Sequence, residues 1–257
     1  MKKIKKLSDK QQEKYSRQIL MNQIGGKGQL SIINSSILVI GCGGLGTSAI
    51  SYLAMAGIGE LGIVDFDKVS LSNLNRQSLF TEKDIGRLKV DVVEEKVKLI
   101  NSDINLIKKN TRITAANLPN LLKNFKIVLD CTDNFKSRYI INSFCHKYKK
   151  ILISAALFNF EVQLFTFKSW ERRAKFPCYN CVFPNIKQMN GMGNCSELGI
   201  IANVAGLGGI LQASMALNLI LKPKNYFYKE FLIYDCSTTT QKKIFIKKNT
   251  NCIVCNK

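Results

Sequence analysis

A glycine-rich segment near the start of the chain has the composition of a phosphate-binding turn. Gly41-Cys42-Gly43-Gly44-Leu45-Gly46 follows an apolar run at 37–40 and precedes a stretch at 47–55 that reads as a helix. Glycines let the backbone approach a phosphate, and a helix N-terminus points free N–H groups at it. Asp65 ends a second apolar run about 20 residues later, where a carboxylate can accept hydrogen bonds from ribose hydroxyls. The spacing predicts a nucleotide site, although the glycine motif alone also occurs as a packing turn.

The segment after this second run adds polar and cationic side chains. Asn73, Arg76 and Lys89 follow within 25 residues of Asp65. A dinucleotide pyrophosphate can be held by backbone groups alone, whereas a triphosphate carries more charge and needs cations. The segment therefore favours ATP over NAD as the nucleotide.

A second acidic motif, Asp130-Cys131-Thr132-Asp133-Asn134, follows the apolar run at 127–129. Ligands bind at the carboxyl ends of strands in open α/β sheets, so Asp133 is a candidate ligand for Mg²⁺ near the phosphates. The alternative is that Asp133 or Asn134 only caps the helix that begins near residue 135.

Two Cys-x-x-Cys pairs form a third signal: Cys178 with Cys181, and Cys252 with Cys255. Together they supply four thiolates, which match a tetrahedral zinc ion. All four positions would be filled by protein, so the zinc is expected to be structural. A redox dithiol and unligated core cysteines are the alternatives.

Composition limits the classes of partner and compartment. The net charge is +20, but the lysines are scattered without an arginine-rich run, so we expect no nucleic acid and consider an acidic protein partner. Residues 198–221 carry no charge but contain several amides and glycines, which favours a buried helix over a membrane span. Cys42, Cys131 and Cys145 fall in predicted core elements, so a reduced, cytoplasmic protein without a secretory leader is expected.

Strands and helices alternate along the first part of the chain, which predicts a doubly wound, mostly parallel α/β sheet of the Rossmann type. The expected strands are 37–41, 61–65, 104–113, 126–131, 151–155, 162–167, 229–235 and 242–247, the last two as antiparallel edge strands. The expected helices are 8–21, 45–56, 87–100, 115–123, 135–148 and 204–221. We expect a glycine turn at 25–28 and an irregular, cysteine-containing segment at 170–197.

The motifs together resemble the ThiF/MoeB/HesA family, the bacterial relatives of ubiquitin-activating enzymes. The resemblance runs from about Tyr15 to Cys255 and rests on Tyr15-Ser16-Arg17-Gln18-Ile19, the glycine motif, 65–77, Gly86-x-x-Lys89, 130–134, Asn194-Cys195 and both cysteine pairs. It implies an ATP-dependent adenylyltransferase that activates the C-terminal Gly-Gly carboxylate of a small ubiquitin-like sulfur carrier protein, in molybdopterin or thiamine biosynthesis.

The resemblance also implies roles for individual residues. Arg76, Lys89 and Asp133 would act in catalysis, Arg17 would reach into the partner's site across a homodimer, and Cys195 matches a cysteine that can link to the carrier. The nucleotide-binding set would be Gly41, Gly43, Gly44, Gly46, Asp65, Asp67, Ser72, Asn73, Asn75, Arg76, Lys89, Asp133 and Asn134.

One adenylation domain over 1–257 is expected, with three parts: a helical arm at 1–30, a nucleotide-binding half at 35–157, and a carrier-binding and zinc-binding half at 158–257. A separate sulfurtransferase or cysteine desulfurase would donate the sulfur. Activation of a tRNA-linked or peptide carboxylate or amide, a carrier-binding scaffold without activity, and a NAD-dependent oxidoreductase remain as alternatives.

Overall fold

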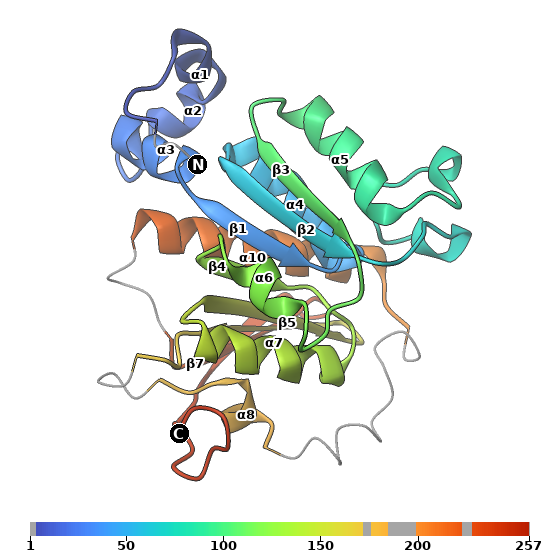
Figure 1. Ribbon diagram of the computed structural model, residues 1–257, viewed down its shortest axis with the longest axis vertical. Helices are drawn as coiled ribbons and strands as arrows, with labels where there is room; N and C mark the ends of the chain where they lie inside the picture. The colour runs from blue at the N-terminus through green and yellow to red at the C-terminus, as the bar shows by residue number, and fades with distance from the viewer. Residues whose placement is uncertain (1–3, 172–175, 185–198, 223–227, 257) are drawn as a thin grey trace.

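The computed structural model describes residues 4–171, 176–184, 199–222 and 228–256. One eight-stranded sheet forms the centre of the molecule, in the order β3-β2-β1-β4-β5-β6-β7-β8 (Figure 1). Its strands are β1 (Ser36–Ile40), β2 (Glu60–Asp65), β3 (Asn105–Asn110), β4 (Ile127–Asp130), β5 (Ile151–Phe158), β6 (Glu161–Phe167), β7 (Glu230–Asp235) and β8 (Thr240–Phe245).

The first five strands are parallel and the last three are antiparallel. β1 pairs with both β2 and β4, β2 with β3, and β4 with β5, all in parallel. β6, β7 and β8 extend the sheet through antiparallel pairs. This arrangement confirms the predicted fold class, with one difference: β6 joins the antiparallel part.

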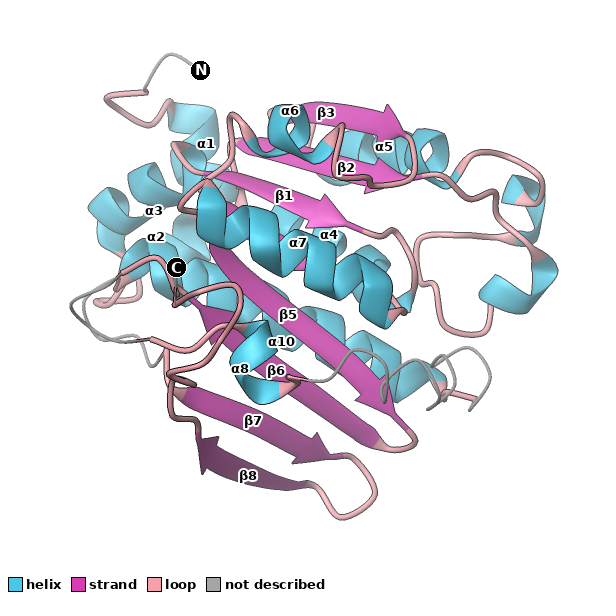
Figure 2. Ribbon diagram, turned by 60° about the horizontal axis from the view of Figure 1, so that its bottom comes forward, coloured by secondary structure: helices cyan, strands magenta, loops and turns pink. Residues whose placement is uncertain are grey.

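Helices cover both faces of the sheet (Figure 2). The helices are α4 (Gly44–Ala56), α5 (Lys89–Ile100) and α10 (Ala202–Leu221) on one face, and α6 (Leu118–Leu122), α7 (Phe135–Lys147) and α8 (Tyr179–Val182) on the other. Two apolar cores result, one on each side. Strands buried on both faces read as continuous apolar runs, as β1 and β2 do, which is why the sequence pattern located them.

The N-terminal segment differs from its prediction. The expected helix 8–21 is two short helices, α1 (Asp9–Lys14) and α2 (Ser16–Ile19), separated at Tyr15. The ring of Tyr15 is buried against Gly57, and its hydroxyl accepts a hydrogen bond from Asn101 Nδ2 at 2.9 Å. The helix is thus interrupted at the residue that packs against the C-terminal end of α4.

The expected turn at 25–28 is wrong, because this segment begins α3 (Gly25–Ile33). A Cβ on Gly28 would lie 3.0 Å from side-chain atoms of both Ile24 and Leu221. Glycine in a helix costs about 1 kcal/mol relative to alanine, but here it allows α3 to approach the end of α10 closely.

Helix α10 is long and apolar enough to cross a membrane by length and composition alone, with a mean hydropathy of 1.7. In this fold it packs against α4, β5 and β6. A Cβ on Gly209 would lie 2.2 Å from the carbonyl oxygen of Leu45, so the two helices meet at glycine. It is a core helix, as the amides and glycines in its sequence predict.

Candidate functional site

A cleft of about 640 Å³ opens at the carboxyl ends of β1, β2 and β4. β1 lies between β2 and β4, and the chain leaves β1 toward one face and β4 toward the other, which is the switch point where such sheets bind ligands. The predicted residues that line it are Gly41, Gly43, Gly44, Asp65, Asp67, Asn73, Asn75, Arg76, Lys89, Asp133 and Asn134. Three separate loops and the start of α5 thus bring eleven of the candidate residues to one site.

The glycine turn between β1 and α4 depends on glycine at two positions. Gly41 has a φ of 100°, which L-residues with side chains rarely adopt. A Cβ on Gly46 would lie 1.9 Å from the Gly41 carbonyl oxygen, so Gly46 closes the turn and does not line the cleft. Gly43 precedes α4 without any side-chain cap, which leaves the helix N-terminus available to an anion.

Asp65 has a structural task that the sequence reading missed. Its carboxylate accepts hydrogen bonds from the backbone N–H of Cys42 at 2.6 Å and of Asp67 at 2.8 Å. Burial raises the pKa of Asp65, although both N–H groups and Lys89 act to lower it. Asp65 therefore fixes the glycine turn relative to the next loop, and it lines the cleft at the same time.

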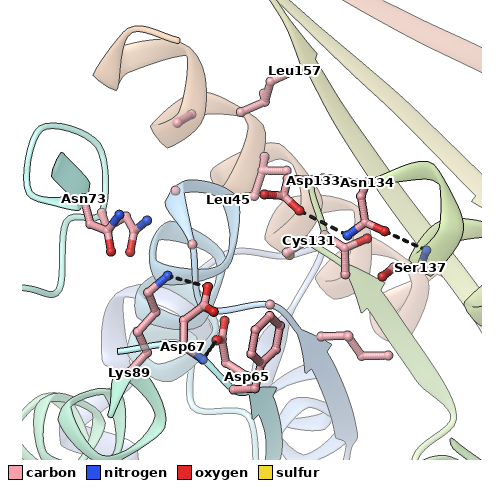
Figure 3. Close-up of a pocket in the computed structure, with 18 of the residues that line it drawn as sticks. Leu45, Asp65, Asp67, Asn73, Lys89, Cys131, Asp133, Asn134, Ser137 and Leu157 are labelled. Atoms are coloured by element: carbon pink, nitrogen blue, oxygen red, sulfur yellow. Dashed lines mark hydrogen bonds and ion pairs between the residues drawn. The ribbon is translucent and has the colours of Figure 1, made fainter. Parts of the chain in front are cut away.

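Lys89 is a buried cation at the first turn of α5. Its side chain is 7% exposed, and Nζ lies 3.2 Å from Asp67 Oδ2 (Figure 3). A buried lysine is stable only when its charge is paired, and Asp67 supplies that charge from the loop after β2. The pair places one cation at a fixed point of the cleft wall.

The loop after β2 positions its own side chains. Arg76 Nη1 donates to the Ser72 carbonyl at 2.8 Å and to Asn75 Oδ1 at 3.0 Å. Asn73 Oδ1 accepts from the Ser70 N–H. Ser72 itself does not line the cleft. Its carbonyl orients Arg76.

The loop after β4 separates the two roles considered for its acidic motif. Asn134 accepts a hydrogen bond from the Ser137 N–H at 2.9 Å and so caps α7. Asp133 is exposed and its Oδ1 accepts only a hydrogen bond from Asn134 Nδ2 among the described residues, so a carboxylate faces the cleft (Figure 3). Carboxylate oxygens are the ligands that Mg²⁺ prefers, so Asp133 fits the predicted ion.

Below this loop, a buried carboxylate and a buried cation stabilise the cleft floor. Asp130 Oδ1 accepts from both the N–H and the hydroxyl of Thr132, while Arg138 Nη2 donates to the Thr132 carbonyl at 2.9 Å. Burial raises the pKa of Asp130, and the charge of Arg138 counteracts it. The sequence reading did not select Arg138, because its helix position carries no motif.

Two further groups in the cleft wall were also not selected. Arg112 lies over the ring of Phe66 with 3.9 Å between its guanidinium carbon and the ring centroid. Gln77, next to Arg76 in the quoted motif, lines the cleft and is buried. Its position beside Arg76 was the signal that could have identified it.

Of the predicted catalytic residues, Arg17 lies away from the cleft. Arg17 is exposed on α2, which the Tyr15 contact holds at the C-terminal end of α4. This position is near the amino ends of the parallel strands, whereas the cleft lies at their carboxyl ends (Figure 1). Cys195 lies outside the described residues.

The four paired cysteines meet in one place, and we refer to Cys178, Cys181, Cys252 and Cys255 as the cysteine cluster. All four Sγ atoms lie within 4.8 Å of one another, with 3.5 Å from Cys178 to Cys252 and 3.5 Å from Cys181 to Cys255. Tetrahedral zinc with Zn–S bonds near 2.3 Å requires separations of about 3.8 Å. Four soft thiols at these distances fit structural zinc.

Hydrogen bonds attach the cysteine cluster to α7. Asn142 donates to Asn180 Oδ1 at 2.9 Å and accepts from the Tyr179 N–H at 3.0 Å. Tyr139 donates its hydroxyl proton to the Phe183 carbonyl. The segment that carries Cys178 and Cys181 is thereby joined to the helix that begins at the cleft.

Comparisons with known proteins show which proteins the chain is similar to. A model of the ThiF family matches residues 15–254. The chain is 37% identical over 256 residues to "Adenylyltransferase and sulfurtransferase MOCS3" of Aedes aegypti, with 98% of this chain and 57% of the relative covered. It is 31% identical over 244 residues to "Sulfur carrier protein adenylyltransferase" of Thermus thermophilus, with 95% and 90% covered.

Among solved structures, E. coli MccB with MccA-N7isoASN superposes with a TM-score of 0.82 at 22% identity, and 98% of this chain and 76% of MccB are covered. This likeness shows the fold alone. The chain spans little more than half the length of the MOCS3 relatives that it matches.

Proposed function

The chain belongs to the ThiF family, and from this membership we propose that it is an ATP-dependent adenylyltransferase that activates a sulfur carrier protein. The substrate is the C-terminal Gly-Gly carboxylate of a small ubiquitin-like carrier. The product is a carrier acyl-adenylate, with pyrophosphate released. The observation that carries the proposal is the cleft, where a free helix N-terminus, Arg76 and Lys89 line one anion-binding volume.

The chemistry requires charge neutralisation more than proton transfer. A carboxylate is already ionised at neutral pH, because its reference pKa is near ~4. Its oxygen forms a bond to the α-phosphorus, and the bond from that phosphorus to the bridging oxygen of pyrophosphate breaks. No general base is needed, and the cleft lining supplies cations and amides for charge neutralisation beside the carboxylates Asp65, Asp67 and Asp133.

The nucleotide would lie across the three loops. We assign the ribose to Asp65, which keeps a place in the cleft lining while it holds the glycine turn. The glycine turn, with Gly43 and Gly44 at the N-terminus of α4, is assigned the α-phosphate. Asn73, Arg76 and Lys89 are assigned the remaining phosphates. Asp133 would hold a Mg²⁺ ion, which supplies further positive charge to the phosphates.

We propose that the active form is a homodimer. Arg17 lies at the edge of the sheet opposite the cleft, so it cannot serve the cleft of its own chain in this structure. In a dimer it would complete the partner's site. Mixing Arg17→Ala with Arg76→Ala protein tests this, because each heterodimer regains one intact site. We expect about a quarter of the parent activity from a mixture of two inactive proteins.

The cysteine cluster would hold structural zinc and take no part in the reaction. Cys195 would serve as an attachment point of the carrier. A separate sulfurtransferase or cysteine desulfurase would supply sulfur to the activated carrier, in molybdopterin or thiamine biosynthesis. The names of the MOCS3 and sulfur carrier relatives support this choice over peptide or tRNA substrates.

Hydroxylamine trapping tests the proposed product. The protein is incubated with ATP, Mg²⁺, hydroxylamine and a carrier that ends in Gly-Gly, and the carrier is analysed by intact-mass spectrometry. We expect a C-terminal hydroxamate that requires both ATP and this protein. A hydroxamate on a peptide or on a tRNA-linked carboxylate, with none on any carrier, would identify a different substrate.

A further inference from the structure

Gln77 is a buried amide in the wall of the cleft. Gln77 is 3% exposed, and it follows Arg76 directly in the loop after β2. Its Nε2 lies 3.9 Å from the point that a Cβ on Gly43 would occupy. The carboxamide therefore lies beside the residue that begins α4.

The carboxamide of Gln77 makes no side-chain hydrogen bond to any residue in the described ranges, and its buried Oε1 has no partner. A buried amide without hydrogen bonds is unfavourable, and such groups in native proteins require an explanation. Gln77 could be replaced by an apolar side chain of similar size if packing were its only role. In the wall of the cleft, its unpaired carboxamide is available to a ligand.

Two other buried glutamines show what a structural role looks like. Gln212 Nε2 donates to the carbonyls of Asp130 and Ile153, and its Oε1 accepts from Cys131. Gln29 donates to the Ala56 carbonyl, although its Oε1 also lacks a partner. Each of these glutamines links two elements by a hydrogen bond from its side chain to a backbone carbonyl. Gln77 makes no such bond to a described residue.

The surroundings of Gln77 select an anionic ligand. The uncapped N-terminus of α4 lies on one side and Arg76 precedes it in the chain. In this setting Nε2, which lies nearest to Gly43, is the useful atom, because an N–H group donates to anionic oxygen. An oxygen bound at the helix N-terminus would be within reach of the same N–H group.

We propose that Gln77 Nε2 donates a hydrogen bond to a non-bridging oxygen of the α-phosphate at which the carrier carboxylate attacks. This deepens, and rests on, the proposed adenylation. The bond forms from carboxylate oxygen to α-phosphorus as the bond to pyrophosphate breaks, and Gln77 keeps both amide protons. A neutral donor stabilises the added charge on the phosphate oxygens in the transition state without adding a cation.

The test compares Gln77→Met, which keeps the volume without a donor, with Gln29→Met as a matched buried control at the opposite edge of the sheet. Calorimetry measures the binding of AMP and of adenosine, and ATP–pyrophosphate exchange measures kcat/KM. In Gln77→Met we expect AMP to bind about tenfold more weakly and adenosine to bind unchanged. We expect kcat/KM for exchange to fall about 100-fold. Gln29→Met should match the parent in all three.

Two negative results are distinguishable. AMP binding and exchange within twofold of the parent in Gln77→Met would overturn the role of Gln77. Absence of exchange in the parent with every carrier would overturn the proposed function instead. The AMP-versus-adenosine comparison would still decide whether Gln77 contacts the α-phosphate. Gln77→Glu adds a carboxylate beside the phosphate and should weaken AMP binding further than Gln77→Met.

Discussion

The cleft and the cysteine cluster both gather side chains from distant parts of the sequence, but they satisfy those side chains in opposite ways. In the cluster, the four sulfur atoms face one another and three of the cysteines are buried. In the cleft, polar side chains use one atom to hold a loop and direct other atoms into an open volume, as Arg76 does through the Ser72 carbonyl. The first arrangement is closed and suits a structural ion, and the second leaves room for a substrate.

A cluster of reactive residue types is therefore not by itself a reaction site. Hydrogen bonds from Cys178 and Cys255 lower the pKa of Cys181, so a thiolate forms readily there. A thiolate is a nucleophile or a metal ligand, and the three surrounding sulfurs favour the metal. Predictions that separate stability from activity therefore test the comparison.

The largest expected effect concerns the cysteine cluster. Cys181→Ser should lose bound zinc and lower the free energy of unfolding by on the order of 5 kcal/mol or more. For a chain of this size that is a fall in Tm of roughly 10–20 °C. Metal analysis and thermal unfolding check it, with Cys236→Ser as the control outside the cluster. If the parent protein keeps its full stability after its zinc is removed, a structural role of the ion is contradicted.

The second effect concerns activity alone. Arg76→Ala should lower ATP–pyrophosphate exchange by about 100-fold or more, because it removes a preorganised positive charge from the cleft. Its Tm should stay near that of the parent, since the hydrogen bonds of the Arg76 side chain to described residues stay within its own loop. Lys98→Ala, which removes a surface ion pair on α5, serves as the charge-matched control. A large fall in Tm would mean that Arg76 is structural.

The third effect tests whether the two regions are independent. Asn142→Ala removes the two hydrogen bonds of Asn142 to the segment that carries Cys178 and Cys181, and it leaves the bond from Tyr139 to Phe183 in place. We expect a loss of about 2 kcal/mol in unfolding free energy, because two buried partners lose their bonds. The kcat for exchange should remain within about threefold of the parent. A fall in kcat far beyond this would show that the cluster positions the cleft through α7.

The smallest effect is a dependence on pH that follows from Asp65. Burial raises its pKa in the folded state above the unfolded value of about 4. Its contribution to stability is therefore fully present below about pH 4 and is lost as the pH rises through the raised pKa. Asp65→Asn should remove this loss, with a difference in slope of at most about 1.4 kcal/mol per pH unit. Urea unfolding at a series of pH values measures it, and identical slopes would contradict the assignment.

The sequence predicted the sheet well because its strands are continuous apolar runs with glycine or acidic residues at their ends, as in 37–41 and 61–65. It predicted the N-terminal helices poorly. The break at Tyr15 and the helical glycines at 25–28 depend on contacts with Gly57 and Leu221, which no local pattern carries.

The candidate site follows the same rule. Motif residues such as Arg76, Lys89 and Asp133 were selected because their types and spacing suit phosphates. The structure brings them to one cleft, and their roles remain predictions. Arg112 and Arg138 were missed because they reach the cleft through tertiary packing. The division into three parts at residues 30 and 157 likewise remains a prediction.

ATP–pyrophosphate exchange with a matched pair of carriers tests the central claim most directly. One carrier ends in Gly-Gly and the other lacks the last glycine, and each is assayed with purified protein and Mg²⁺. We predict exchange that depends on the complete carrier tail and is absent without carrier. Protein that binds ATP and zinc but shows no exchange with any Gly-Gly carrier would contradict the assignment of this cleft to carrier adenylation.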